Sequence, residues 1–228
     1  MAALGASKTV IVVTGGDPVP AGVLARLPED ATVVAADSGL DHARDLGLDV
    51  GLVVGDLDSV DPATLEAAIA AGTVVERHPE AKDSTDLELA LDAAERLGAT
   101  HLVVLGGHGG RLDHLLANAL LLADPRRSHL EVVAHMGEAT VTVVRGWATL
   151  VGAPGELVSL LAVHGVASRV TTEGLLYPLD AEDLLPGSTR GVSNELVGNV
   201  ARVSIDAGVV LAVQPGRFGT HHLSTEHP

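Results

Sequence analysis

The sequence predicts an α/β fold in which an N-terminal open parallel-sheet (Rossmann-like) domain is followed by a C-terminal all-β sandwich domain. Through about residue 136, short aliphatic runs alternate with helical patterns, which indicates an open α/β sheet. From about Glu138, strand-like segments follow one another with Gly, Pro and Asn turn signals between them, which suggests a compact all-β domain. We therefore expect domains at residues 1–137 and 138–220, and a polar tail at 221–228.

The individual elements follow from the hydrophobic pattern. Continuous Val, Ile and Leu runs are typical of parallel strands buried on both faces. They predict N-terminal strands at residues 9–14, 32–36, 50–54, 73–76, 101–105 and 130–134. Helical patterns between them lie near residues 21–26, 40–46, 62–71, 86–97 and 112–122. C-terminal strands are expected at residues 139–144, 157–163, 166–172, 200–205 and 209–213.

Composition indicates the kind of core and the kind of partner. Hydrophobic residues make up 46% of the chain and are mostly Ala, Val and Leu, with one Trp, one Tyr and one Phe. We place Trp147 in the core of the sandwich domain. The net charge of −16 argues against a nucleic-acid binder, which normally carries a basic surface. So acidic a chain would repel polyphosphates unless metal ions intervene, and it would attract a cationic substrate.

No secretory or membrane feature is predicted. The chain start lacks the basic and long apolar segments of a signal peptide, and no apolar run reaches the ~20 residues that span a bilayer. The lack of cysteine excludes disulfides, thiolate chemistry and cysteine-ligated zinc. We expect a soluble cytoplasmic protein with no membrane partner.

Candidate functional residues gather where the predicted strands end. Ligands of open parallel sheets bind outside the carboxyl ends of the strands. Gly and Asp are ordinary loop residues, but four such endings on one rim indicate a binding site. The four endings are Gly15-Gly16-Asp17, Asp37-Ser38-Gly39, Gly55-Asp56-Leu57-Asp58-Ser59 and Gly106-Gly107-His108-Gly109-Gly110-Arg111.

Asp56 and Asp58 are the sharpest local signal. If the backbone is still extended after the strand, residues two apart project from the same side, and paired carboxylates are costly without a cation or proton between them. Mg²⁺ typically takes one or two carboxylates plus substrate phosphate oxygens. A pair of solvated turn aspartates, with Ser59 capping the next helix, explains the motif equally well.

Residues 82–88 mark a helix start and a second charged cluster. Thr85 followed three residues later by Glu88 fits a capping box, and Asp86 in the first turn suits the helix dipole. Capping does not explain why Lys82, Asp83 and Asp86 are concentrated there. A phosphate and metal site would.

The glycine-rich segment at residues 106–118 predicts a phosphate-binding loop. Its glycines, including Gly109 and Gly110, let backbone N–H groups approach a phosphate, and the positive end of the next helix points there. Arg111 suits a phosphate, and Asp113 lies in the first turn. His114 is as consistent with a structural role as with a ligand-binding one. Arg111, His114 and Asn118 fall on one helix face, opposite Leu112, Leu116 and Ala119.

The order of the motifs AADSG, GDLDS, KDSTDLELAL and LGGHGGRLDHLLANALLL, followed by VTTEGLLYPL and GVSNE, resembles the thiamine pyrophosphokinases. The resemblance covers nearly the whole chain. It implies an ATP- and magnesium-binding α/β catalytic domain and a β-sandwich that binds thiamine and forms a homodimer. Each active site would lie between the α/β domain of one subunit and the sandwich of the other.

The resemblance also implies roles for individual residues. Asp37, Asp56, Asp58 and Asp86 would hold Mg²⁺ and the polyphosphate, with Asp56, Asp58 and Asp86 as metal ligands. Arg111 and Asp113 would face the ATP phosphates. The remaining nucleotide-binding candidates are Lys82, Asp83, Thr85, Gly109, Gly110, His114 and Asn118. Tyr177, Ser193 and Asn194 would line the thiamine pocket from the partner chain, and Tyr177 could stack on the thiamine cation.

The implied reaction is attack by the hydroxyl of thiamine on the β-phosphorus of ATP, which releases AMP and thiamine diphosphate. Asp86 and Asp113 are both candidates to accept the hydroxyl proton. Two alternatives remain, namely a pyrophosphokinase of another alcohol and a non-catalytic nucleotide or thiamine sensor. A sensor could lose metal-binding carboxylates, yet every acidic position of the motifs is filled here, which favours an enzyme.

Overall fold

The computed structural model describes residues 7–80 and 83–216. The N-terminal half contains β1 (Thr9–Val13), η1 (Ala21–Arg26), β2 (Thr32–Ala36), α1 (Gly39–Asp45), β3 (Val50–Gly55), α2 (Pro62–Ala70), β4 (Val74–Arg77), α3 (Asp86–Arg96), β5 (His101–Leu105), α4 (Leu112–Leu122), η2 (Pro125–Arg127) and β6 (Glu131–Met136). The C-terminal half contains β7 (Ala139–Val144), β8 (Trp147–Val151), β9 (Leu157–Ala162), β10 (Ala167–Glu173), β11 (Glu182–Leu184), β12 (Asn194–Glu195), β13 (Val200–Ser204) and β14 (Val210–Gln214).

The predicted strands and helices are confirmed closely. One difference is that residues 21–26 form a 3-10 helix rather than an α-helix. The sequence did not predict η2 or the strands β8, β11 and β12, two of which are only two or three residues long. The predicted tail at residues 221–228 lies outside the described residues.

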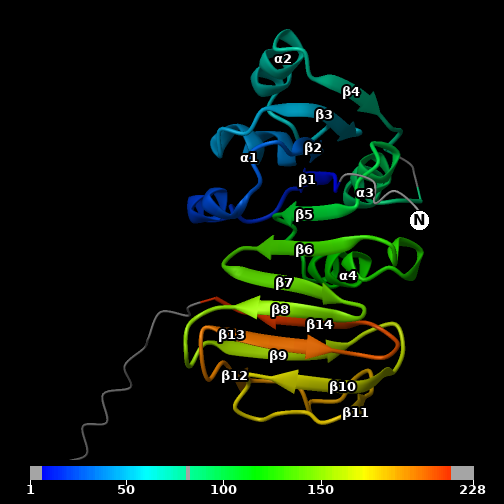
Figure 1. The fold of residues 1–228 in the computed structure, drawn as a ribbon. Coiled ribbons are helices and arrows are strands. Elements are labelled where there is room, and N and C mark those ends of the chain that lie inside the picture. The colour runs from blue at the N-terminus through cyan, green and yellow to red at the C-terminus, as the bar shows by residue number, and fades with distance from the viewer. Residues whose placement is uncertain (1–6, 81–82, 217–228) are drawn as a thin grey trace, which may run out of the picture.

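A single ten-stranded sheet runs through both halves of the chain, in the order β12-β9-β14-β7-β6-β5-β1-β2-β3-β4 (Figure 1). The strands from β6 to β4 in this order are parallel, and β7, β14, β9 and β12 continue the sheet antiparallel. The fold is therefore a mixed α/β fold with one large mixed sheet. The boundary expected near residue 137 falls in the β6–β7 turn, inside that sheet.

Alternating residues of the parallel strands face opposite sides of the sheet, as the two-residue period of a strand requires. On one side, Val10, Val12 and Val34 pack with Leu87 and Leu91 of α3. The other side carries η1, α1 and α2, where Ile11 and Val13 of β1 pack with Val23 of η1, for example. Within the described residues, none of the helices has the length and apolar character needed to cross a membrane.

A smaller antiparallel sheet, in the order β11-β10-β13-β8, packs on the C-terminal strands of the large one. The shared core includes Leu150 of β8, Leu160 of β9 and Val210 of β14. The prediction that Trp147 lies in this core is wrong, because its side chain is 77% exposed. β8 is an edge strand in which Leu150 points inward, so Trp147 and Val151 point outward.

A buried arginine ties α3 to the turn after α4. Arg127 of η2 is 3% exposed and pairs with Glu95 at 2.9 Å and with Asp124 at 3.0 Å, and it also pairs with Asp92. Three carboxylates around one buried guanidinium satisfy its donors, which is the condition under which a buried charge is tolerated.

Candidate active site

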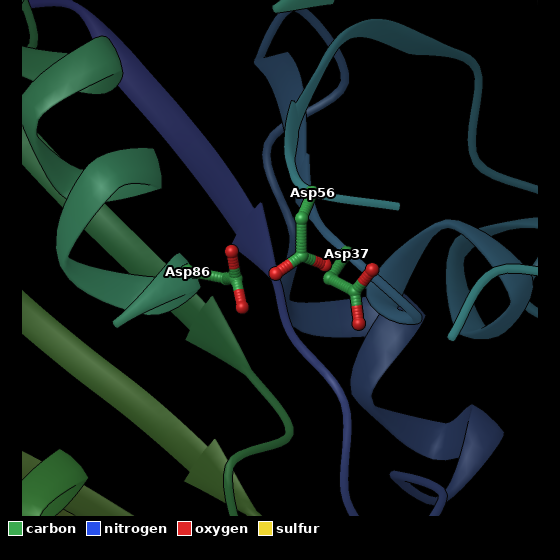
Figure 2. Close-up of side chains that lie close together, drawn as sticks. All are labelled: Asp37, Asp56 and Asp86. Atoms are coloured by element: carbon green, nitrogen blue, oxygen red, sulfur yellow. The ribbon is translucent and has the colours of Figure 1, made fainter. Parts of the chain in front are cut away.

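Three aspartates meet at the carboxyl rim of the parallel strands. Asp37 follows β2, Asp56 follows β3, and Asp86 is the first residue of α3. One carboxylate oxygen from each lies within 4.8 Å of the others, and Figure 2 shows the three side chains lying close together. The rim predicted from the strand endings therefore does bring acidic groups together.

The backbone allows this approach because Gly55 has no side chain. A Cβ at Gly55 would lie 3.1 Å from Asp86 Oδ1 and 3.2 Å from Asp37 Cβ, and its φ of +147° is one that L-residues rarely adopt. Asp37 itself has φ 46° and Leu57 has φ 64°, so two non-glycine residues beside the cluster are in the left-handed region. Such conformations cost free energy and concentrate at functional sites.

The electrostatics of the cluster favour a bound cation. Asp37 Oδ1 is buried and accepts no hydrogen bond from the described residues. Burial raises the pKa of Asp37, and the charges of Asp86, Asp56 and Asp58 raise it further, against a lowering hydrogen bond from Ser38. Three converging carboxylates with an unsatisfied oxygen are a donor set that fits a hard divalent cation such as Mg²⁺.

Asp58 does not belong to this group of three. Its backbone N–H donates to Asp56 Oδ1 at 3.3 Å, and its own Oδ1 accepts from Ser59 Oγ at 2.9 Å. The expectation of an extended backbone at residues 56–58 is wrong, because Leu57 is left-handed and turns the chain. The structure therefore gathers Asp37 with Asp56 and Asp86. Sequence reasoning had placed Asp37 beside the polyphosphate without singling it out as a metal ligand.

Thr85 caps the start of α3 as the sequence predicts, although the Glu88 carboxylate pairs with Arg126 rather than completing the expected capping box. Thr85 Oγ1 accepts from the backbone N–H of Glu88 at 3.2 Å, and this cap places Asp86 in the first turn. The Glu88 carboxylate pairs with Arg126 at 2.7 Å, so it ties the helix to the η2 turn. Asp83 is exposed just before the helix, and Lys82 lies outside the described residues.

The loops after β1 and β5 are joined along their backbones. Gly107 N–H donates to Gly15 O at 2.8 Å, and Asp17 N–H donates to His108 O at 2.6 Å. Gly106 has φ +99°, and a Cβ there would lie 2.3 Å from Thr14 O, so the loops approach too closely for a side chain. The predicted glycine loop is thus a rigid element at the point where β1 and β5 lead to opposite faces of the sheet.

Arg111 and Asp113 stand at the entry to α4. Both side chains are exposed. Arg111 donates from Nη2 to Asp113 Oδ2 at 2.5 Å and from Nε to Asp113 Oδ1 at 3.1 Å, and this pairing lowers the pKa of Asp113 to about 2. Asn118 Nδ2 donates to Gly107 O at 3.2 Å and so supports the glycine loop. His114 is exposed. Gly109 and Gly110 precede Arg111 with φ of +91° and +63°.

The face of α4 opposite these residues is not buried. Leu112, Leu116 and Leu120, which are four residues apart, are all exposed. The helix contacts the core instead through Leu115 and Leu122, together with Leu121.

The three predicted thiamine-binding residues lie at the other end of the large sheet. Asn194 begins β12, Ser193 precedes it with φ 57°, and Tyr177 lies between β10 and β11. Seven strand spacings separate β12 from β2, and at about 4.8 Å each they amount to at most about 34 Å along the sheet. Figure 1 shows β12 and β2 toward opposite ends of the molecule. One chain therefore does not bring the two sets together.

A cavity of about 820 Å³ lies between η1, the β6–β7 turn and the β8–β9 hairpin. None of the predicted site residues lines it, so this cavity is separate from the carboxylate cluster on the open rim. His135 lines the cavity, and burial, with a smaller effect of Arg26, lowers its pKa. Sequence reasoning did not find this cavity, because its lining residues are scattered and form no motif.

Two family models from the same enzyme family match the N-terminal and the C-terminal half of the chain. A family model described as "Thiamin pyrophosphokinase, catalytic domain" matches residues 25–134, and one described as "Thiamin pyrophosphokinase, vitamin B1 binding domain" matches residues 150–210. The chain is 25% identical to thiamine pyrophosphokinase of Bacillus subtilis (strain 168), over 91% of this chain and 98% of that protein.

Solved structures extend the comparison to the fold. Thiamine pyrophosphokinase from Bacillus subtilis gives a TM-score of 0.81 at 24% identity and covers 92% of this chain and 100% of that one. Thiamin pyrophosphokinase from Geobacillus thermodenitrificans gives 0.77 at 27% identity, over 92% and 99%. The matched family models, the relative and the shared fold together show that the chain belongs to the thiamine pyrophosphokinase family.

Proposed function

We propose that this chain transfers the pyrophosphate group of ATP to the hydroxyl of thiamine, giving thiamine diphosphate and AMP. The observation that carries the proposal is the cluster of Asp37, Asp56 and Asp86 in the half matched by the catalytic-domain model. The other half is matched by the vitamin B1 binding model. A pyrophosphoryl transfer needs both, because it depends on positioning two substrates and neutralising phosphate charge.

Asp37, Asp56 and Asp86 would hold Mg²⁺, with Asp58 beside them. When bound, the ion neutralises phosphate charge and orients the polyphosphate. The aspartates would keep the ion at the strand ends, and the buried Oδ1 of Asp37 would gain a partner that none of the described residues provides. Neutralisation of the phosphate charge by Mg²⁺ would also explain how a chain of net charge −16 can bind ATP.

The ATP phosphates would lie over the glycine loop and the start of α4. Backbone N–H groups at Gly109 and Gly110 and the positive end of the helix suit an anion. Arg111 is exposed at the same point, and a phosphate competes with Asp113 for its guanidinium. The further residues that we assign to the nucleotide side are Lys82, Asp83, Thr85, His114 and Asn118.

Asp86 and Asp113 are the two candidates to accept the proton of the thiamine hydroxyl, and each would stand beside a positive charge, Mg²⁺ for Asp86 and Arg111 for Asp113. While Asp113 pairs with Arg111, its pKa of about 2 makes it a weak base at neutral pH. Asp86 projects from α3 into the carboxylate cluster where the phosphates are expected.

We further propose that the active enzyme is a homodimer with shared sites. Asp56 follows β3 near one end of the large sheet, and Tyr177 is hydrogen-bonded to Asn194 of β12 at the other end, so they can serve one reaction only if two chains bring them together. Ser193 and Asn194 would come from the same chain as Tyr177.

Mixing two variants tests the shared site, at a thiamine concentration well below the KM of Tyr177→Ala, where each variant alone shows little activity. Asp56→Ala and Tyr177→Ala chains, mixed after reversible dissociation, should regain roughly a quarter of wild-type activity, because half the dimers are mixed and each has one intact site. Sites contained within one chain would show no recovery.

The reaction itself is tested by incubating the protein with Mg²⁺, ATP and thiamine and following AMP and thiamine diphosphate together. The two products should appear in equal amounts. ATP cleavage that does not depend on thiamine would contradict the assignment, and faster transfer to another alcohol would identify a different acceptor.

A further inference from the structure

The side chain of Asn194 is buried and engaged with the backbone of Tyr177. It is 4% exposed. Its Oδ1 accepts from the Tyr177 N–H at 2.9 Å and from the Glu195 N–H at 2.9 Å, and its Nδ2 donates to Tyr177 O at 2.7 Å. A buried amide with these three bonds has little capacity left for a ligand.

The Asn194 amide continues a backbone ladder that would otherwise stop. Val197 N–H donates to Gly174 O at 3.0 Å, and Leu176 N–H donates to Glu195 O at 2.9 Å. The ladder cannot continue along the backbone beyond these bonds. On one strand Ser193 turns the chain with φ 57°, and on the other Tyr177 is followed by Pro178, which has no N–H to donate. The side-chain amide of Asn194 is chemically a peptide group, so it pairs with both polar groups of Tyr177 as a further strand would.

The backbone of Asn194 is itself fixed. In β12 it pairs antiparallel with Val158 of β9, at the edge of the ten-stranded sheet. By contrast, the Tyr177 side chain is 57% exposed and makes no hydrogen bond with any described residue. The position of this ring therefore depends on the Tyr177 backbone, and that backbone is tied to the sheet through Asn194.

We propose that Asn194 is a positioning residue, which sets the Tyr177 ring for thiamine without touching thiamine itself. This role rests on the proposed function, in which Tyr177 stacks on the thiamine cation. A ring held in place before binding loses less conformational freedom when thiamine arrives, so the benefit falls on thiamine affinity. ATP binding, at the far end of the same chain, gains nothing from it.

The main variant is Asn194→Ala, which removes all three hydrogen bonds. We expect its KM for thiamine to rise about tenfold, because the Tyr177 side chain must then be ordered when thiamine binds and the cost of ordering one side chain corresponds to about that change in affinity. Its kcat and its KM for ATP should stay near the wild-type values. The control is Asn199→Ala, an exposed asparagine between β12 and β13, which should leave all three constants unchanged.

A double-variant cycle separates positioning from direct contact. If Asn194 acts through Tyr177, then Asn194→Ala should add nothing to the KM increase caused by Tyr177→Ala. A full further increase in the Tyr177→Ala background would overturn the proposal, as would an unchanged KM in the single variant. If Tyr177→Ala alone leaves the KM for thiamine unchanged, the proposed thiamine role of Tyr177 fails instead.

A readout without turnover is available because Tyr177 is the only tyrosine in the chain. Fluorotyrosine labelling gives a single ¹⁹F resonance, which should move or broaden in Asn194→Ala and stay fixed in Asn199→Ala. If Asn194→Ala does not fold, Asn194→Asp keeps an oxygen that accepts from the Tyr177 and Glu195 N–H groups, loses the donor to Tyr177 O and sets a carboxylate oxygen against that carbonyl, so it should also displace the Tyr177 backbone. A resonance and a KM for thiamine that both stay at wild-type values in a folded Asn194 variant would overturn the proposal.

Discussion

Replacing Asp37 by Asn should stabilise the metal-free protein. Asp37, Asp56 and Asp86 hold carboxylate oxygens within 4.8 Å of one another, and the pKa of Asp37 is raised by burial and by its acidic neighbours. The substitution removes one charge at nearly constant volume and therefore removes two of the three repulsive pairs. The same change removes a ligand from the proposed metal site.

The magnitude follows from Coulomb's law. Two carboxylates 4.8 Å apart repel by about 1 kcal/mol in water and by about 3.5 kcal/mol at an effective dielectric constant of 20. Because Asp37 is only partly buried, we take the value near water, and two pairs then give about 2 kcal/mol. For a chain of this size, that corresponds to an increase in Tm of about 4 to 8 °C.

Thermal unfolding followed by circular dichroism measures both effects. With a chelator, Asp37→Asn should have a higher Tm than the wild type. The exposed control Asp49→Asn should have the same Tm as the wild type. Adding Mg²⁺ should raise the Tm of the wild type and of Asp49→Asn, since a ligand that binds only the folded state stabilises it. Asp37→Asn should respond weakly. If Asp37→Asn melts below the wild type in chelator, the cluster is not under electrostatic strain and the reasoning is refuted.

Three further outcomes are expected. Asp56→Ala should nearly abolish formation of thiamine diphosphate while circular dichroism shows an intact fold; near-normal turnover would remove Asp56 from the metal site. Arg127→Ala should lower the free energy of unfolding by about 3 to 5 kcal/mol in urea titrations, because three carboxylates lose a buried partner, whereas the exposed Arg111→Ala should leave it nearly unchanged. Without metal, stability should fall as pH rises from the ordinary aspartate pKa through the raised pKa of Asp37, because the folded state then binds the proton more tightly; Asp37→Asn should lack this dependence.

The parts of the fold that depend on local pattern were predictable. Unbroken aliphatic runs such as residues 101–105 identify buried parallel strands, and the Thr85 and Glu88 spacing identifies the start of α3. The rim followed from the strand endings, because parallel strands bring their carboxyl ends to one edge. These features need no knowledge of which strand pairs with which.

Features set by distant pairing were not predictable in the same way. The continuation of the sheet depends on β14 pairing with β7, where Val210 faces Val144. β12 is two residues long, so its existence depends on its partner strand rather than on its own pattern. Trp147 was misplaced for a related reason, since the sequence did not predict β8 and so did not indicate which face of an edge strand the Trp147 side chain would take.

Which aspartates form the cluster could not be predicted from the sequence either, because the set depends on the backbone conformation of single loop residues. Asp56 and Asp58 were paired by their spacing, which assumed an extended backbone that Leu57 interrupts with φ 64°, and Asp86 was included because the family resemblance implied it. Asp37 joins the group because β2 and β3 are neighbours and Gly55 leaves room between them. A positive φ at a leucine or an aspartate has no clear signature in sequence, so spacing alone could not select the set.

The continuous sheet has a consequence for the quaternary state. Separate domains on a flexible linker could fold back and bring Tyr177 to the aspartates of the same chain, but strands hydrogen-bonded from β12 to β4 keep them apart. In the proposed homodimer each chain would carry one half of two different sites, and a monomer should be folded but inactive. Specific activity should therefore fall on dilution with the concentration dependence of dimer dissociation, measured by sedimentation, while the Tyr177 environment and the fold persist. A monomer that keeps full activity at limiting dilution would show that the two halves meet within one chain, contrary to the geometry of the sheet.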